Sequence, residues 1–244
     1  MGLLLIPTFA EDNAGDHPFC ARGPAPPVPG AVDSPTMSAP QDHYFTARPA
    51  SDGELRRMAV RLAGRDVEVV TAGGIFSPDG IDRGTRVLLA EVPPPPSAGT
   101  FLDLGCGWGP LALTMALESP GARVVAVDVN ERALDLARRN AEALAVADRV
   151  EVLPPDDVPT DQTFDVLWSN PPIRVGKAAL HEMLATWLPR LAPGGTAYLV
   201  VQKNLGADSL QTWLAATLPD LMGPVAVDRT ASSKGFRILR VARA

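Results

Sequence analysis

Glycines and one acidic residue lie together where the first strongly apolar segment ends, in Asp103-Leu-Gly105-Cys-Gly107-Trp-Gly109. Glycines let a ligand approach the backbone closely, and a helix that follows them offers free N–H groups. A dinucleotide-binding fingerprint would place its third glycine at position 110, which is Pro110. An acid beside the loop suits a cationic ligand and repels a pyrophosphate. S-adenosylmethionine, with a sulfonium, an ammonium and no phosphate, fits this pattern, and the alternative is a glycine turn without a ligand.

Acidic residues also follow the next two apolar segments. Asp128 ends the second segment, where a carboxylate can accept both hydroxyls of a ribose, although it could instead be a helix cap or a loop acid. After the third segment, either Asp156 or Asp157 could accept the amino group of an adenine, or both could be solvated; the spacing favours Asp156. With Asn170, described next, the expected contacts to S-adenosylmethionine are Asp103, Gly105, Cys106, Gly107, Asp128, Val129, Asp156 and Asn170.

The fourth apolar segment ends in Asn170-Pro171-Pro172. The two prolines fix the backbone and remove donors, so the nearby carbonyls point outward rigidly. The Asn170 side-chain oxygen and the Pro171 carbonyl could then accept both protons of one amino group. Such a grip would localise the lone pair of a planar, conjugated nitrogen and aim it at a methyl group, and orientation of this kind can supply up to about 7–11 kcal/mol. The expected catalytic residues are therefore Asn170, Pro171 and Pro172, and the alternative is a turn that begins a helix.

These side chains would share one edge of a sheet if the apolar segments are parallel strands. From residue 100 onward, short apolar segments alternate with amphipathic ones, which predicts a parallel sheet covered by helices on both faces. Ligands in such folds bind outside the carboxyl ends of the strands. The last two strands have no helix between them and predict an antiparallel hairpin. The expected strands are 100–104, 122–128, 149–153, 164–169, 197–201, 225–228 and 236–241. The expected helices are 111–118, 130–144 with Asn130 as its cap, 178–191 and 208–218, with a turn at 193–195.

The chain ahead of this sheet differs in composition. Residues 1–40 are rich in proline and are expected to form a disordered lead, either a genuine tail or the product of an upstream start codon. We do not expect a signal peptide, because these residues have neither a basic starting segment nor a cleavage site. Residues 41–98 are expected to form a small β/α extension on the substrate side, with strands at 43–45 and 66–71 and a helix at 85–91 capped by Thr85. Residues 99–244 are expected to form the catalytic domain.

Charge and cysteine content limit the function classes. A net charge of −6 argues against wide, non-specific nucleic-acid binding but not against a locally basic site. Nothing approaches the ~20 consecutive apolar residues of a membrane helix. The 2 cysteines are too few for a disulfide framework and indicate a reducing compartment, the cytoplasm. His43 and His181 have no metal-spaced partners, so no metal is expected.

The glycine loop, Asp128 and Asn170-Pro-Pro172 together resemble the class I S-adenosylmethionine-dependent methyltransferases that modify amino groups. The stretch from His43 to Arg240 resembles, more closely, the RsmC-like family of 16S ribosomal RNA guanine-2-amino methyltransferases. This resemblance implies a seven-stranded Rossmann-like fold, a cytoplasmic protein, a small-subunit ribosomal RNA substrate, and a guanine amine held by Asn170 and Pro171. It rests on Gly74-Ile-Phe76-Ser77, Asp82-x-Gly84-Thr85, Asn170-Pro-Pro-Ile-Arg174-Val-Gly176-Lys177 and Ser233-Lys234-Gly235-Phe236-Arg237.

The chain departs from that family in two ways. Longer members carry a second, degenerate methyltransferase-like domain ahead of the catalytic one, whereas only 41–98 is available here, so RNA must dock differently. The position after Pro-Pro is often aromatic, for stacking on a flipped base, but here it is Ile173. Phe76 or Trp168 could stack instead, unless both belong to the core. The expected substrate contacts are Phe76, Ile173, Arg174 and Lys177.

Basic residues for an RNA backbone fall into three groups, each of which could instead be solvated surface. Arg174 is the strongest candidate for a phosphate contact because it is adjacent to the reactive loop. The groups are Arg56, Arg57, Arg61 and Arg65 at helix-like spacing, then Arg174 and Lys177, then Arg229, Lys234 and Arg237.

Other functions remain open from the sequence. Methylation of a glutamine amide in a translation factor, or of adenine in DNA, uses the same grip but usually has an aromatic residue at the position of Ile173. A non-catalytic module that binds S-adenosylmethionine or RNA would not need an intact Asn170-Pro-Pro172. Pro110 disfavours a nicotinamide dehydrogenase, and Cys106 has no activating partner in sequence for a nucleophilic role.

Overall fold

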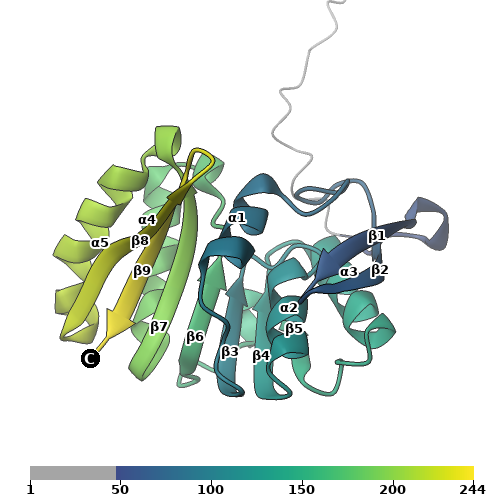
Figure 1. Cartoon of the computed structure of the whole chain (residues 1–244), viewed down its shortest axis with the longest axis horizontal. Coiled ribbons are helices and arrows are strands. Elements are labelled where there is room, and N and C mark those ends of the chain that lie inside the picture. Colours follow the sequence, from purple (N-terminus) through teal and green to yellow (C-terminus); the bar gives the residue numbers. More distant parts are fainter. Residues whose placement is uncertain (1–47) are drawn as a thin grey trace, which may run out of the picture. The chain divides into compact units, whose positions relative to one another are not determined.

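The computed structural model describes residues 48–244, and its main element is a seven-stranded sheet in the order β5-β4-β3-β6-β7-β9-β8 (Figure 1). The first five strands of this order are parallel, while β9 is antiparallel to both β7 and β8. This arrangement confirms the predicted α/β class with its C-terminal hairpin. The strands are β3 (Ala98–Leu104), β4 (Gly121–Val127), β5 (Val150–Leu153), β6 (Phe164–Ser169), β7 (Leu191–Gln202), β8 (Val225–Ser233) and β9 (Phe236–Arg243).

Different helices cover the two faces of this sheet. Phe101 and Val124 belong to one core with side chains of α1, α2 and α3, whereas Leu102 and Val125 belong to a second core with α4 and α5. Successive residues of a strand point to opposite faces, so a strand buried on both sides is apolar throughout. The helices are α1 (Arg83–Glu91), α2 (Pro110–Glu118), α3 (Glu131–Ala143), α4 (Lys177–Trp187) and α5 (Ala207–Met222).

A two-stranded antiparallel hairpin, β1 (Arg56–Leu62) and β2 (Arg65–Thr71), precedes the large sheet and packs against the core under α2 and α3. The predicted strand at 66–71 is confirmed. Ala63 and Gly64 turn the chain with φ of 48° and 72°, the pair of positive angles that suits a two-residue hairpin loop.

The expected helical spacing of Arg56, Arg57, Arg61 and Arg65 is wrong, because all four lie on this hairpin. Apolar residues at every second position of β1 face the core, which is the period of a strand. Three of the four arginines form exposed ion pairs, with Asp79, Glu68 and Asp66.

Two other boundaries differ from the sequence expectation. α1 begins at Arg83 and its cap is Asp82, not Thr85, because the Asp82 carboxylate accepts from the N–H groups of Gly84 and Thr85. The expected turn at 193–195 lies inside β7, where the register with β6 shifts. A Cβ at Gly195 would lie 2.8 Å from the carbonyl of Ala192, so only glycine fits this bulge.

The expected strand at 43–45, His43 and the proline-rich lead at 1–40 lie outside the described residues. Within residues 48–244, no helix is both long and apolar enough to cross a membrane. The same part of the chain holds no group of three or more His, Cys, Asp or Glu side chains suited to a metal ion.

Candidate active site

The carboxyl ends of β3, β4 and β6 bring the predicted residues together. In the sheet register, Leu104 of β3 pairs with Val127 of β4 on one side and with Ser169 of β6 on the other. The buried Ser169 hydroxyl donates to the Leu104 carbonyl at 2.7 Å. This bond fixes the end of β6 beside the start of the glycine loop, so Asn170 follows at the same edge as Gly105.

The glycine loop is folded back onto the end of β4. The N–H groups of Gly105 and Cys106 both donate to the Val127 carbonyl, at 2.8 and 2.9 Å. Gly105 and Gly107 have φ of 81° and 55°, which side chains other than glycine rarely adopt. A Cβ added at either position would meet nothing within 4 Å. The loop therefore presents bare backbone to open space, as a site for close ligand approach requires.

Asp103 lies beneath this loop with no exposed surface. Its Oδ2 accepts from the N–H of Ala112 at 2.8 Å, whereas Oδ1 has no hydrogen-bond partner among the described residues. Burial, together with the negative charge of Asp128, raises the pKa of Asp103 to about 8. A buried carboxylate oxygen without a partner is costly, and a nearby cation would relieve that cost.

Asp128 follows β4 and accepts one backbone hydrogen bond on each oxygen. Gly107 donates to Oδ2 and Asn130 donates to Oδ1, both at 2.9 Å. Burial raises the pKa of Asp128, and these backbone hydrogen bonds oppose the rise. Because each carboxylate oxygen has a second lone pair, Asp128 can still accept hydroxyl groups.

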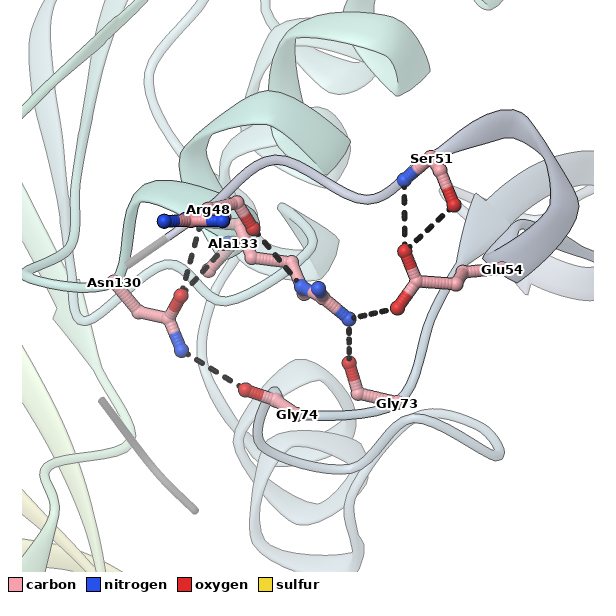
Figure 2. A network of polar contacts seen from close by, with 8 residues as sticks. Arg48, Ser51, Glu54, Gly73, Gly74, Asn130 and Ala133 are labelled. Atoms are coloured by element: carbon pink, nitrogen blue, oxygen red, sulfur yellow. Dashed lines mark hydrogen bonds and ion pairs between the residues drawn. The ribbon is translucent and has the colours of Figure 1, made fainter. Parts of the chain in front are cut away.

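The N-terminus of α3 holds the segment that follows β2, as Figure 2 shows. Asn130 caps α3 through Oδ1 and is within hydrogen-bond distance of the Gly74 carbonyl through Nδ2, at 3.0 Å. Arg132, only 9% exposed, donates to the carbonyls of Gly73 and Arg48 and to the Glu54 carboxylate, each at 3.0 Å.

Glu54 is held from a second side in this network. The Ser51 hydroxyl and N–H donate to its carboxylate, at 2.7 and 2.9 Å. These hydrogen bonds, followed by that from Arg132, lower the pKa of Glu54 to about 2. Asn130 and Arg132 therefore anchor the segment that carries Phe76. Asn130 is only two residues after Asp128, so this anchor lies beside the expected ribose site.

The Asn170 side chain has a defined orientation. Its Nδ2 donates to Asp82 Oδ2 at 2.9 Å and to Thr85 Oγ1 at 3.1 Å. Both protons of the amide are therefore used, and Oδ1 remains as an acceptor. The Pro171 carbonyl accepts from the Ile173 N–H at 2.8 Å, which leaves it one lone pair.

A small cavity of about 30 Å³ is lined by some of these residues, but Asp103, Asp128, Pro171 and Pro172 are not among them. Its lining combines the glycine loop, the start of α2, Asn170 with its two partners, and Phe76, which is 52% exposed. The Cys106 thiol is also in the lining, but burial and then the charges of Asp128 and Asp103 raise its pKa well above the usual value. It stays protonated, which excludes an activated nucleophile.

Other predicted site residues lie outside this cavity lining. Val129 is 66% exposed, and Asp156 is exposed on a 3-10 turn, Pro155–Asp157. Ile173 is half-buried on a second 3-10 turn, Ile173–Val175, while Arg174 and Lys177 are exposed. Trp168 is 2% exposed and belongs to the core, so it is not available for stacking on a base.

Sequence reasoning missed the partners of Asn170 and two exposed cations of α1. From the sequence, Asp82 was noted only within a motif that resembles the family, and Thr85 only within that motif and as an expected helix cap. Arg83 and Arg86 are exposed on α1. The sequence signal that could have identified them as site residues was that they follow Asp82 within four positions. By contrast, Arg229 and Arg237 of the hairpin lie 3.5 and 3.8 Å from Asp208.

Comparison with known proteins agrees with this geometry. The methyltransferase small domain family matches residues 66–240. The uncharacterized protein YbxB of Bacillus subtilis is 31% identical over 202 residues, which are 82% of this chain and 97% of YbxB. The ribosomal RNA large subunit methyltransferase G of Pseudomonas syringae is 34% identical over 152 residues, 57% of this chain and 39% of that protein. The chain thus spans about two fifths of that longer relative.

A solved structure shares the fold. The 16S rRNA N2 G1207 methyltransferase RsmC of T. thermophilus, in complex with AdoMet and guanosine, has a TM-score of 0.64 and 24% sequence identity. The match covers 80% of this chain and 52% of RsmC. The bare glycine loop, the Asp103 carboxylate oxygen that has no partner within residues 48–244, and the acid after β4 fit a cationic cofactor with a ribose. The chain belongs to the methyltransferase small domain family and is an S-adenosylmethionine-dependent methyltransferase.

Proposed function

We propose that the protein transfers a methyl group from S-adenosylmethionine to an exocyclic amino nitrogen, namely the 2-amino group of a guanine in 16S ribosomal RNA in the cytoplasm. The observation that carries this proposal is the orientation of Asn170. Its amide protons are bound by Asp82 and Thr85, so the oxygen is the group left to accept from a substrate amine. This acceptor lies in one cavity lining with the glycine loop.

Four features would hold the cofactor, whose sulfonium supplies an electrophilic methyl group when it is bound. The buried Asp103 carboxyl, whose pKa is raised to about 8, would become negatively charged as the ammonium approaches, and the loop at Gly105 and Gly107 allows close approach of the ligand. Asp128 would accept the ribose hydroxyls. Asp156, exposed after β5, would accept from the adenine amino group.

The chain's own contribution to the reaction is orientation rather than base catalysis. Asn170 Oδ1 and the second lone pair of the Pro171 carbonyl would accept the two amine protons, which localises the nitrogen lone pair. Among the described residues that line the cavity there is no His or Lys, and the Cys106 thiol is held protonated. The methylated nitrogen is acidic enough to lose its proton to water.

An RNA substrate is supported by cations near this edge of the sheet. Arg83 and Arg86 on α1, and Arg174 and Lys177 after β6, are exposed and have no ion pair within residues 48–244. Unpaired arginine and lysine side chains are the usual phosphate ligands. Phe76, half exposed at the cavity, can stack on a base that has left the helix.

The test is methyl transfer from labelled S-adenosylmethionine to small subunits, large subunits, free ribosomal RNA, release factors and DNA, all from a strain that lacks the gene. We expect label in 16S RNA, located at one guanine by nucleotide mapping, and a loss of about 100-fold or more in Asn170→Ala. Label found only in a protein or in DNA would sink the RNA assignment. Full activity in Asn170→Ala would sink the proposed grip.

A further inference from the structure

We propose that Asp82 and Thr85 are positioning residues that set which end of the Asn170 amide faces the substrate amine. This inference rests on the proposed function, because it concerns the acceptor of that amine. Asp82 Oδ2 and Thr85 Oγ1 receive the two Nδ2 protons, at 2.9 and 3.1 Å. All three side chains line the same cavity.

The orientation matters because the two ends of an amide have the same shape but opposite polarity. A half-turn of the Asn170 side chain would present N–H donors to a substrate amine that must itself donate. It would also place Oδ1 against the Asp82 carboxylate, which only accepts. Because a hydrogen bond to a charged group is stronger than a neutral one, Asp82 favours the productive orientation over its reverse.

The same carboxylate oxygen fixes the start of α1. Asp82 Oδ2 accepts from the Gly84 N–H at 2.6 Å and from the Thr85 N–H at 3.4 Å, in addition to Asn170. The helix N-terminus and the amide therefore converge on one atom. α1 packs against β7 and β9, so its position, and with it that of Asp82, is set by the sheet that also carries Asn170.

Gly84 leaves room for this arrangement. A Cβ there would lie 2.9 Å from Asp82 Oδ2 and 3.2 Å from Asn170 Oδ1. The Phe236 ring also lies 3.2 Å from this Cβ. The contact with Asp82 is shorter than side chains tolerate and the other two are tight, so a larger residue would shift Asp82 and press on Asn170 and Phe236. The space around the amide is thus closed on the side of α1.

The experiment must separate orientation of Asn170 from capping of α1. Asp82→Ala removes both roles, whereas Asp82→Asn keeps an acceptor oxygen that serves both. Thr85→Val removes one acceptor of Asn170 and leaves the cap in place. Ala90→Gly, on an exposed position of the same helix, weakens α1 without touching the site and is the matched control.

Three measurements are made on the full chain: methyl transfer to small ribosomal subunits, equilibrium binding of S-adenosylmethionine, and ¹⁵N NMR of the Asn170 side-chain amide, assigned by its loss in Asn170→Ala. Asp82→Ala should lower kcat about 10- to 100-fold, the effect of losing a charged hydrogen-bond partner, with KM and cofactor affinity within about 2-fold. The Asn170 amide protons should lose their protection from exchange. Thr85→Val should have a kcat and an amide protection between those of wild type and Asp82→Ala. Asp82→Asn, which keeps an acceptor oxygen but loses the charge, should also lie between them.

The proposal is overturned if Asp82→Ala matches Ala90→Gly in kcat and leaves the Asn170 amide protons protected. It is also overturned if Asp82→Asn, while remaining folded, is less active and leaves the Asn170 amide less protected than Asp82→Ala does, because an acceptor oxygen at this position would then contribute nothing to the orientation. If the wild-type protein labels another substrate instead of ribosomal RNA, the proposed function fails. The variants are then compared on that substrate, and the NMR result stands independently of it.

Discussion

Asp103 and Ala112 are joined by a buried hydrogen bond of 2.8 Å between Oδ2 and the backbone N–H of α2. The other carboxylate oxygen, Oδ1, has no partner among the described residues. Burial and the neighbouring charge of Asp128 raise the pKa of Asp103 from 3.8 to about 8. A carboxyl group tuned this way is neutral at pH 7 until a cation approaches, which links its ionisation to cofactor binding.

Cofactor affinity should therefore depend on pH. Asp103 ionises as the pH rises to about 8, so affinity for the cationic cofactor should increase from pH 6 to pH 8. An α-amino group loses its proton near pH ~7.7–8.0, so affinity should fall above that range. Titration calorimetry across pH 6–10 checks the resulting maximum near pH 8. A flat profile, or a rise that persists in Asp103→Asn, would contradict the role given to Asp103.

The same group affects the free energy of unfolding, with a sign that can be worked out. Because the pKa of Asp103 is raised from 3.8 to about 8, the folded state binds more protons than the unfolded state between these values. The contribution of Asp103 to the free energy of unfolding therefore falls as the pH rises through this window, by up to about 1.4 kcal/mol per pH unit. Without cofactor, Asp103→Asn should gain Tm relative to wild type between pH 5 and pH 8. If the difference in Tm between Asp103→Asn and wild type stays constant from pH 5 to pH 8, burial does not raise the pKa of Asp103.

Gly84→Ala tests whether the space beside Asn170 matters for activity rather than for folding. Alanine favours a helix over glycine by about 1 kcal/mol, which offsets part of the strain from contacts at 2.9 Å to Asp82 and 3.2 Å to Asn170. We expect a Tm within a few degrees of wild type and a kcat at least 10-fold lower on ribosomal RNA. Gly53→Ala is the control, since a Cβ there meets nothing within 4 Å. Equal activity in both variants would mean that the amide tolerates displacement.

The strands beneath the site could be predicted because their signals are local. The buried strand at 164–169 coincides with β6, and Asn130 caps α3 as expected. The partners of Asn170 could not be derived in this way, since Asp82 is 88 positions away in the chain. β1 was missed because its arginines also fit a helical spacing, and only the apolar alternation ending in Leu62 favours a strand.

The contacts that hold the segment after β2 could not be predicted from the local sequence either. Asn130 was predicted as a cap, but its closeness to the Gly74 carbonyl depends on how β2 packs on α3. Likewise, nothing in the local sequence distinguishes Arg132 from its exposed neighbour Glu131, although Arg132 is buried and joins three distant segments.

Arg132 should therefore control the order of the segment that carries Phe76. Arg132→Leu keeps an apolar side chain in place of the arginine stem but leaves the Gly73 and Arg48 carbonyls without their donor, at a cost of about 1–3 kcal/mol in unfolding free energy. Hydrogen exchange should increase across residues 73–82, and KM for ribosomal RNA should rise more than kcat falls. Arg139→Leu is the control, because Arg139 lies on the same helix and its ion pairs, with Asp135 and Asp52, do not reach that segment. Unchanged exchange at 73–82 in Arg132→Leu would show that β2 and α1 alone hold the segment in place.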